Sequence, residues 1–291
     1  MDYAQETRAH RGVLFLAMGA FGLVFFLWQL AAQNTTINQL LYPFRLIVTF
    51  VHEAGHGLSA LISGGRFIQF TVFENGAGVA TTAGGNRILV ISMGYLGAAL
   101  FGAVLLYAAN RVHRIRVVAV LTGLFFLGCA LLFTGRDGTI LIGGASVAIF
   151  AWSAGGTLNG QSQQIGSALR GVAIIALLLT FFLVRNNVAL LTGIISGTVL
   201  FGLAALATPI VITFTLNVLA LIVGFNALND ILALWNNQSA RLGNVPNDAL
   251  ALANLTNLPV NLWLLIWLIA ALGMMSVSIY FGVVRPLRQA N

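Results

Sequence analysis

The chain has 291 residues, of which 59% are hydrophobic and only 7% are charged. Because a soluble domain carries about a quarter charged residues, this composition excludes soluble enzymes and disordered chains. The formal net charge of +7 comes from 14 arginines against 7 acidic residues. The arginines stand one to three at a time in short connections, which is typical of helix ends anchored at lipid headgroups and not of a nucleic-acid-binding face. The sequence therefore predicts a polytopic protein embedded in the lipid bilayer, without a nucleic-acid partner.

A helix that crosses a bilayer needs about 20 mostly apolar residues. This rule predicts eight or nine crossings, near 13–31, 43–63, 88–109, 115–134, 138–154, 168–184, 188–206, 208–234 and 260–283. The stretch 138–154 is short and glycine-rich, so it is also compatible with a re-entrant segment. The expected fold is an all-α polytopic membrane protein in which residues 1–291 form one integral membrane domain. Residues 1–12 would be a polar N-terminal tail in front of an uncleaved signal anchor.

One segment departs from the helical pattern. Residues 66–73 are rich in aromatic and β-branched side chains, residues 74–78 have the composition of a turn, and residues 79–82 return as a second strand. This pattern predicts a small β-hairpin within 64–87, between two spans. Since the amides at a hairpin edge cannot remain unpaired in lipid, the hairpin should lie at the interface or inside a cavity.

Few ionisable residues fall inside the predicted spans, and three of them are His52, Glu53 and His56. A charged side chain at membrane depth costs roughly 2.5–3.5 kcal/mol on insertion scales and usually marks function. The three residues form an H-E-x-x-H pattern, which places both histidines on one face of a helix, where they can bind one zinc ion. Glu53 is placed to take a proton from water activated by that metal. The alternative is a pair of histidines satisfied by backbone carbonyls.

A catalytic zinc ion usually has three protein ligands, so a third ligand is expected elsewhere in the chain. Asp230 is the first candidate because it ends an apolar helix with no arginine near it in the sequence. Asp248 is the alternative, although its place before an apolar run also fits a helix N-cap. Asp137 is the weakest candidate because it adjoins an arginine in a glycine-rich loop. Asn226 and Asn229 are candidates for orienting a ligand or for binding the substrate backbone.

The segment Phe50-Val51-His52-Glu53-Ala54-Gly55-His56-Gly57-Leu58-Ser59-Ala60-Leu61 resembles the zinc helix of site-2-protease-like intramembrane metallopeptidases. Further motifs resemble the small bacterial and plant branch of that family and occur in its order: Gly76-Ala77-Gly78-Val79, Gly84-Gly85-Asn86-Arg87, Gly94-Tyr95-Leu96-Gly97, Asn229-Asp230-Ile231, Asn247-Asp248-Ala249 and Leu255-Thr256-Asn257-Leu258-Pro259. Two departures stand out. The Asn-Pro…Leu-Asp-Gly arrangement that carries the third ligand in the better-known members is absent, and residues 135–168 look like an additional helical pair.

The resemblance implies a zinc metalloprotease that hydrolyses peptide bonds in or near transmembrane segments of membrane protein substrates. It also implies a location in the bacterial cytoplasmic membrane. Glu53 would be the general base, and the hairpin would hold an unwound substrate by main-chain hydrogen bonds, with Phe70 and Val72 as candidate substrate contacts. A catalytically silent zinc-binding scaffold or chaperone is the alternative, with an ion transporter as a third possibility.

Overall fold

The computed structural model describes residues 3–31, 33–158, 162–185 and 187–285. Its helices are α1 (Tyr3–Ala31), α2 (Thr35–Ile62), α3 (Arg87–Ser92), α4 (Tyr95–Arg111), α5 (Ile115–Phe133), α6 (Arg136–Leu158), α7 (Gln163–Val184), α8 (Val188–Leu206), α9 (Pro209–Asn236), α10 (Asp248–Thr256) and α11 (Val260–Ile279), followed by a π-helical turn at Tyr280–Val284. Its strands are β1 (Arg66–Val72), β2 (Gly78–Ala83), β3 (Arg241–Leu242) and β4 (Val245–Pro246). The predicted all-α fold with one small hairpin between the histidine-bearing helix and the next span is confirmed.

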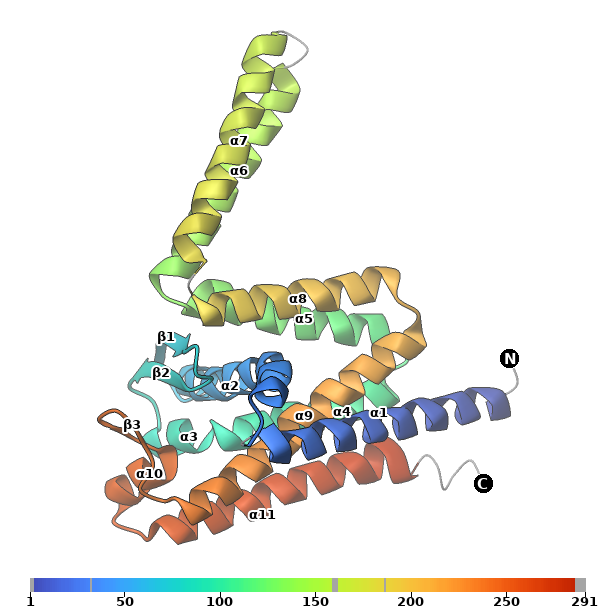
Figure 1. The fold of residues 1–291 in the computed structure, drawn as a ribbon, viewed down its shortest axis with the longest axis vertical. Coiled ribbons are helices and arrows are strands. Elements are labelled where there is room, and N and C mark those ends of the chain that lie inside the picture. The colour runs from blue at the N-terminus through green and yellow to red at the C-terminus, as the bar shows by residue number, and fades with distance from the viewer. Residues whose placement is uncertain (1–2, 32, 159–161, 186, 286–291) are drawn as a thin grey trace.

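The helices of the bundle lie in layers around α2. In the view of Figure 1, α5 and α8 lie above α2, α11 lies below it, and α9 runs diagonally from the end of α8 down to the bottom of the bundle. Helices α1, α4 and α9 also contact α2. The strands and the short helices α3 and α10 gather at one end of the bundle, and the N-terminus lies toward the other end (Figure 1). His52, Glu53 and His56 of α2 therefore lie between long helices on two sides, with the hairpins at one end.

Six helices of the described chain are long and apolar enough to cross a membrane: α5, α6, α7, α8, α9 and α11, the last taken together with its π-helical turn. Phe15–Ala31 of α1 is a shorter apolar helix. The other expected crossings correspond to α2, whose hydropathy is lowered by Arg45 and the H-E-x-x-H residues, and to α4, which has 17 residues. This protein is thus an integral, multi-pass membrane protein.

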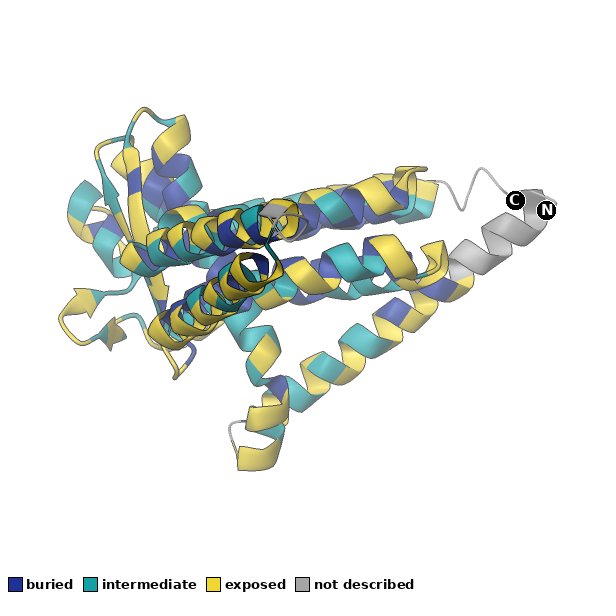
Figure 2. Cartoon of the chain, turned by 90° about the horizontal axis from the view of Figure 1, so that it is seen from above, coloured by how far each residue is buried: buried dark blue, intermediate teal, exposed yellow. Residues whose placement is uncertain are grey.

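The outer faces of the long helices carry apolar side chains, as lipid contact requires. Figure 2 shows exposed positions alternating with buried ones along the helices. On α7 the exposed residues from position 172 onward are all apolar, namely Val172, Ile174, Ile175, Leu177, Leu178, Leu179, Phe181, Phe182 and Leu183. The buried core is formed by the inner faces of the remaining helices and includes Phe50, Phe126, Leu216 and Trp267.

Helices α6 and α7 form a hairpin that runs away from the bundle at a steep angle (Figure 1). They pack on each other along their lengths, and α6 also contacts α5. A small core of Ala148, Ala151 and Ala173 lies between them, separate from the main core. The additional helical pair expected within 135–168 is longer than that range, because α7 extends to Val184. In addition, α6 is a continuous helix rather than a short re-entrant segment.

The predicted hairpin consists of β1 and β2 paired antiparallel, with an irregularity between Phe67 and Gln69. The hairpin packs against α2 at a glycine. A Cβ atom at Gly57 would collide with the ring of Phe67, so only glycine lets the strand lie this close to the helix. Thr49 also donates a hydrogen bond of 2.7 Å to the carbonyl of Gly76, which ties the hairpin turn to α2.

The span expected at 88–109 is broken into α3 and α4 at Met93 and Gly94. Asn86 caps α3 by accepting a hydrogen bond of 3.1 Å from the amide of Leu89. The break lies against the two histidines of α2.

Candidate metal centre

The two histidines of the H-E-x-x-H pattern present their Nε2 atoms to each other at 3.1 Å. One turn of α2 separates them, which is why both rings lie on the same face. His56 is buried, and its Nδ1 lies 2.7 Å from the carbonyl oxygen of Val90 on α3. A carbonyl can only accept, so Nδ1 carries the proton and Nε2 of His56 is left with a lone pair for a metal.

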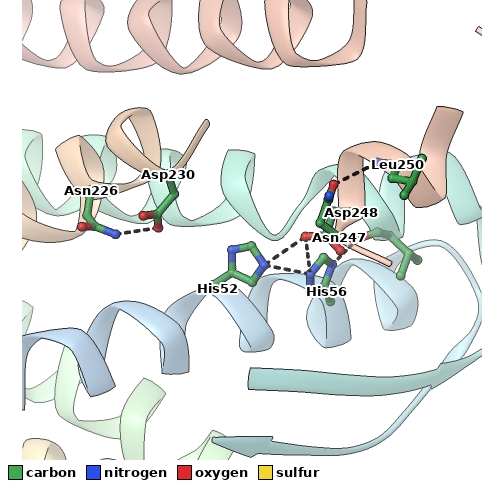
Figure 3. Close-up of polar contacts among 8 residues, drawn as sticks. His52, His56, Asn226, Asp230, Asn247, Asp248 and Leu250 are labelled. Atoms are coloured by element: carbon green, nitrogen blue, oxygen red, sulfur yellow. Dashed lines mark hydrogen bonds and ion pairs between the residues drawn. The ribbon is translucent and has the colours of Figure 1, made fainter. Parts of the chain in front are cut away.

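Asp248 completes the cluster from the far end of the sequence. Its Oδ2 lies 3.1 Å from Nε2 of His52 and 3.3 Å from Nε2 of His56 (Figure 3). The preceding residue, Asn247, accepts a hydrogen bond of 3.0 Å from the amide of Leu250 and so caps α10. Burial acts to raise the pKa of Asp248, but the neighbouring His56 and His52 rings outweigh it and hold the pKa below its ordinary value. Asp248 therefore presents an ionised oxygen to the histidines.

These three atoms have the spacing of a zinc site. Zinc bound tetrahedrally at about 2.0–2.2 Å by nitrogen and oxygen implies distances of roughly 3.3–3.6 Å between ligand atoms, close to those observed. Among the described residues, His52, His56 and Asp248 are the group of metal-binding side chains that converges in this way. Gly94 adds a second indication, because a Cβ atom there would lie 2.5 Å from Nε2 of both histidines. The break between α3 and α4 thus leaves room where a metal ion would sit.

The structure places Asp230, expected first as the third ligand, outside this group. Its Oδ2 accepts a hydrogen bond of 2.6 Å from Asn226, one turn earlier on α9. The geometry favours the alternative, Asp248, because Asn247 takes over the capping role that the sequence assigned to Asp248. Asp137 lies at the start of α6, where it accepts a hydrogen bond of 2.9 Å from Asn187.

Glu53 is 4% exposed and lies on α2 next to the first histidine. Strand β2 passes directly beside it: a Cβ atom at Gly78 would lie 2.5 Å from a Glu53 carboxylate oxygen. The backbone amide of Ala80 is also directed toward this carboxylate. Glu53 is therefore held between the histidine-bearing face of α2 and the edge of β2, beside the cavity.

The cluster opens into a cavity of about 480 Å³ between the two hairpins. Its walls come from α2, β2, α3, α4, the end of α9 and the β3–β4 turn. Its polar and charged lining residues are Thr49, His52, Glu53, His56, Thr82, Tyr95, Asp230, Arg241, Asn247 and Asp248. The cavity is large enough for an extended peptide segment, and it combines a metal-binding cluster with an adjacent carboxylate.

The remaining sequence candidates lie away from this cavity. The side chains of Phe70 and Val72 are buried in the core, where Phe70 packs edge-to-face on Phe50 at 4.9 Å between ring centroids. Asn229 and Asn226 line a small crevice between α9 and α1. In the described structure β2, not β1, is the strand that borders the cavity.

Several site residues were not assigned a role from the sequence: Val90, Gly94, Tyr95 and Asn247. The Gly-Tyr-Leu-Gly motif did contain a signal for Gly94 and Tyr95, and the Asn-Asp pair contained one for Asn247. The Tyr95 ring packs edge-on against His52 at 4.5 Å between centroids. No sequence pattern marks Val90, because it contributes only its backbone carbonyl.

The fold and the site together define a multi-pass membrane protein with a centre of the metallopeptidase type. The chain belongs to the Peptidase M50B-like family, whose model matches residues 16–155 and 138–278. It is thus a membrane metallopeptidase of the site-2-protease type. No curated protein and no solved structure matches the chain.

Proposed function

We propose that this protein is an intramembrane zinc metalloprotease that cleaves peptide bonds in or near transmembrane segments of other membrane proteins. The observation that carries the proposal is the convergence of His52, His56 and Asp248 beside Glu53 in one cavity. When bound by these three side chains, zinc would polarise a carbonyl group and lower the pKa of water toward about 7.

Glu53 would perform the proton transfers. Its carboxylate accepts a proton from the water that attacks the scissile carbonyl carbon. It then donates that proton to the amine nitrogen as the C–N bond breaks, so that a carboxyl and an amino terminus are produced. The nearby amide of Ala80 and the glycine at position 78 hold the carboxylate in reach of the cavity.

The proposed substrate is a transmembrane helix that unwinds locally, because the amides of an intact helix are already hydrogen-bonded. In the described structure β2 pairs with β1 alone, and its residues Gly78, Val79, Ala80 and Thr82 line the cavity. Backbone groups of alternate residues in a strand point to the same edge. An unwound substrate segment can therefore add to β2 by main-chain hydrogen bonds and be guided past Glu53.

Lipid would surround the apolar outer faces of the bundle. The resemblance in sequence motifs supports the bacterial cytoplasmic membrane as the location.

The test separates metal binding from hydrolysis. Wild type, Glu53→Gln and His56→Ala are purified in detergent and their zinc content is measured by mass spectrometry. His113→Ala, in the connection between α4 and α5, is the matched control. Membranes that contain each variant are then compared for new peptide N-termini. The proposal expects one zinc per chain in wild type, Glu53→Gln and His113→Ala, little zinc in His56→Ala, and new N-termini only with wild type and His113→Ala.

Two outcomes would contradict the proposal. If wild-type protein binds no zinc, the metal centre is wrongly assigned. If zinc is bound but no N-terminus depends on Glu53, the chain is a zinc-binding scaffold rather than a protease.

A further inference from the structure

The two histidines of the cluster differ in how their second ring nitrogens are held. A histidine that binds a metal usually donates its other N–H to a carboxylate, a carbonyl or water, which fixes the tautomer and the ring orientation. His56 meets this requirement through the carbonyl of Val90. His52 uses Nε2 toward His56 and Asp248, whereas its Nδ1 has no hydrogen-bond partner among the described residues.

Asp230 lies on the side of His52 opposite the cluster. Figure 3 shows the His52 ring between Asp248 and Asp230, with its second nitrogen toward Asp230. Both residues line the same cavity. No direct hydrogen bond joins the two side chains among the described residues. The cavity that they share has a polar lining, which is the kind of space in which a water molecule bridges two such groups.

Asp230 is itself held in a defined orientation. Asn226 donates a hydrogen bond of 2.6 Å to Oδ2, and the carboxylate makes no ion pair within the described part of the chain. A carboxylate at membrane depth is costly unless a donor offsets it. The Tyr95 ring packs against the His52 ring at 4.5 Å between centroids and so limits rotation of the imidazole.

We infer that Asp230 is a positioning residue for the metal ligand His52. Its carboxylate accepts the Nδ1–H of His52 through one water molecule, so that the Nε2 lone pair is directed at the metal. The inference rests on the proposed zinc site and gives the intramembrane carboxylate of α9 a role that is distinct from ligation.

The test compares Asp230→Leu, Asp230→Asn and a matched control on the same helix, Thr215→Val, whose hydroxyl bonds only within α9. Zinc affinity is measured by competition with a chromogenic chelator, and the absorption spectrum of the Co²⁺-loaded protein reports the number of ligands. Nitrogen NMR of labelled histidine reports the tautomer of His52. Thermal unfolding verifies that each variant is folded.

We expect Asp230→Leu to weaken zinc binding by about 10–100-fold while the tetrahedral cobalt spectrum is kept. The zinc affinity of Asp230→Asn should lie between those of Asp230→Leu and wild type, because an amide oxygen still accepts a hydrogen bond. If the Leu variant does not fold, Asp230→Asn is compared with wild type instead. In the loaded wild type, the proton of His52 should reside on Nδ1, and its resonance should shift in the Leu variant.

Equal zinc affinity in wild type and Asp230→Leu would overturn the inference while leaving the proposed protease intact. A cobalt spectrum that changes as it does in Asp248→Ala would also overturn it, because Asp230 would then be a ligand. Absence of zinc from the wild type would instead contradict the proposed function itself.

Discussion

Asn247 and Asp248 are neighbours in sequence and divide two tasks between them. Asn247 caps α10 through the amide of Leu250, and Asp248 directs its carboxylate at Nε2 of His52, 3.1 Å away. Asn247 also donates hydrogen bonds of 2.8 and 2.9 Å to the carbonyls of Gln238 and Ala240. The position of the Asp248 carboxylate therefore depends on the side chain that precedes it.

Replacement of Asn247 by Ala should cost about 1 kcal/mol of stability from the lost cap and should also weaken zinc binding. The matched control is Asn187→Ala, which removes the cap of α8 at the amide of Leu190, far from the histidines. Thermal unfolding and chelator competition measure the two effects. The prediction is contradicted if both variants lose zinc affinity equally, or if neither does.

Gly94→Ala should empty the metal site. The added Cβ would lie 2.5 Å from both histidine Nε2 atoms, in the space that a metal would occupy, while the rest of the fold has no reason to change. Gly128→Ala on α5 is the control, because a Cβ there meets nothing within 4 Å. One zinc per chain in purified Gly94→Ala protein would show that the metal position is elsewhere.

Unlike Gly94→Ala, Gly78→Ala should keep the metal site filled and reduce cleavage. Its Cβ would lie 2.5 Å from a carboxylate oxygen of Glu53 and 2.7 Å from the Cγ2 of Thr49, so β2 and Glu53 must separate. Zinc content should stay at the wild-type value, whereas Glu53-dependent cleavage should fall at least about tenfold, the effect typical of displacing a general base. Unchanged cleavage in this variant would mean that the contact between β2 and Glu53 is not used in catalysis.

Gly102→Ala should destabilise the bundle without touching the site chemistry. A Cβ at Gly102 would lie 2.5 Å from the Cα of Gly224, so α4 and α9 would have to move apart. Overpacking of this kind typically costs 1–3 kcal/mol. Gly202→Ala on α8, where a Cβ meets nothing within 4 Å, is the control. A melting temperature equal to that of the control would contradict the close approach of the two helices.

Features that depend on residues close together in the sequence could be predicted. The positions of His52 and His56 follow from helical spacing alone, and the hairpin follows from alternation and turn residues between 66 and 82. The approach of Asp248 to the histidines could not be predicted in this way because 196 positions separate Asp248 from His52, and only the packing of α10 brings them together. Asp230 was the more conspicuous candidate because it lies in an apolar helix without a neighbouring arginine.

The break at Met93 and Gly94 escaped prediction for a related reason. The stretch 88–109 is apolar throughout, so hydropathy predicts one uninterrupted span. The interruption is favoured by its surroundings, since the carbonyl of Met93 approaches Gly55 of α2 so closely that a Cβ atom would not fit. Contacts of this kind depend on the partner helix and leave no periodic signal in either segment.

The hairpin of α6 and α7 begins and ends at nearly the same point of the bundle. Asn187, which precedes α8, donates hydrogen bonds to the carbonyl of Thr134 at 3.4 Å and to Asp137 at 2.9 Å, next to the start of α6. Helices α5 and α8 pack directly on each other below this junction. A change in the length of the α6–α7 pair would therefore leave this junction in place, and the cluster of His52, His56 and Asp248 on the other side of α2 would keep its surroundings.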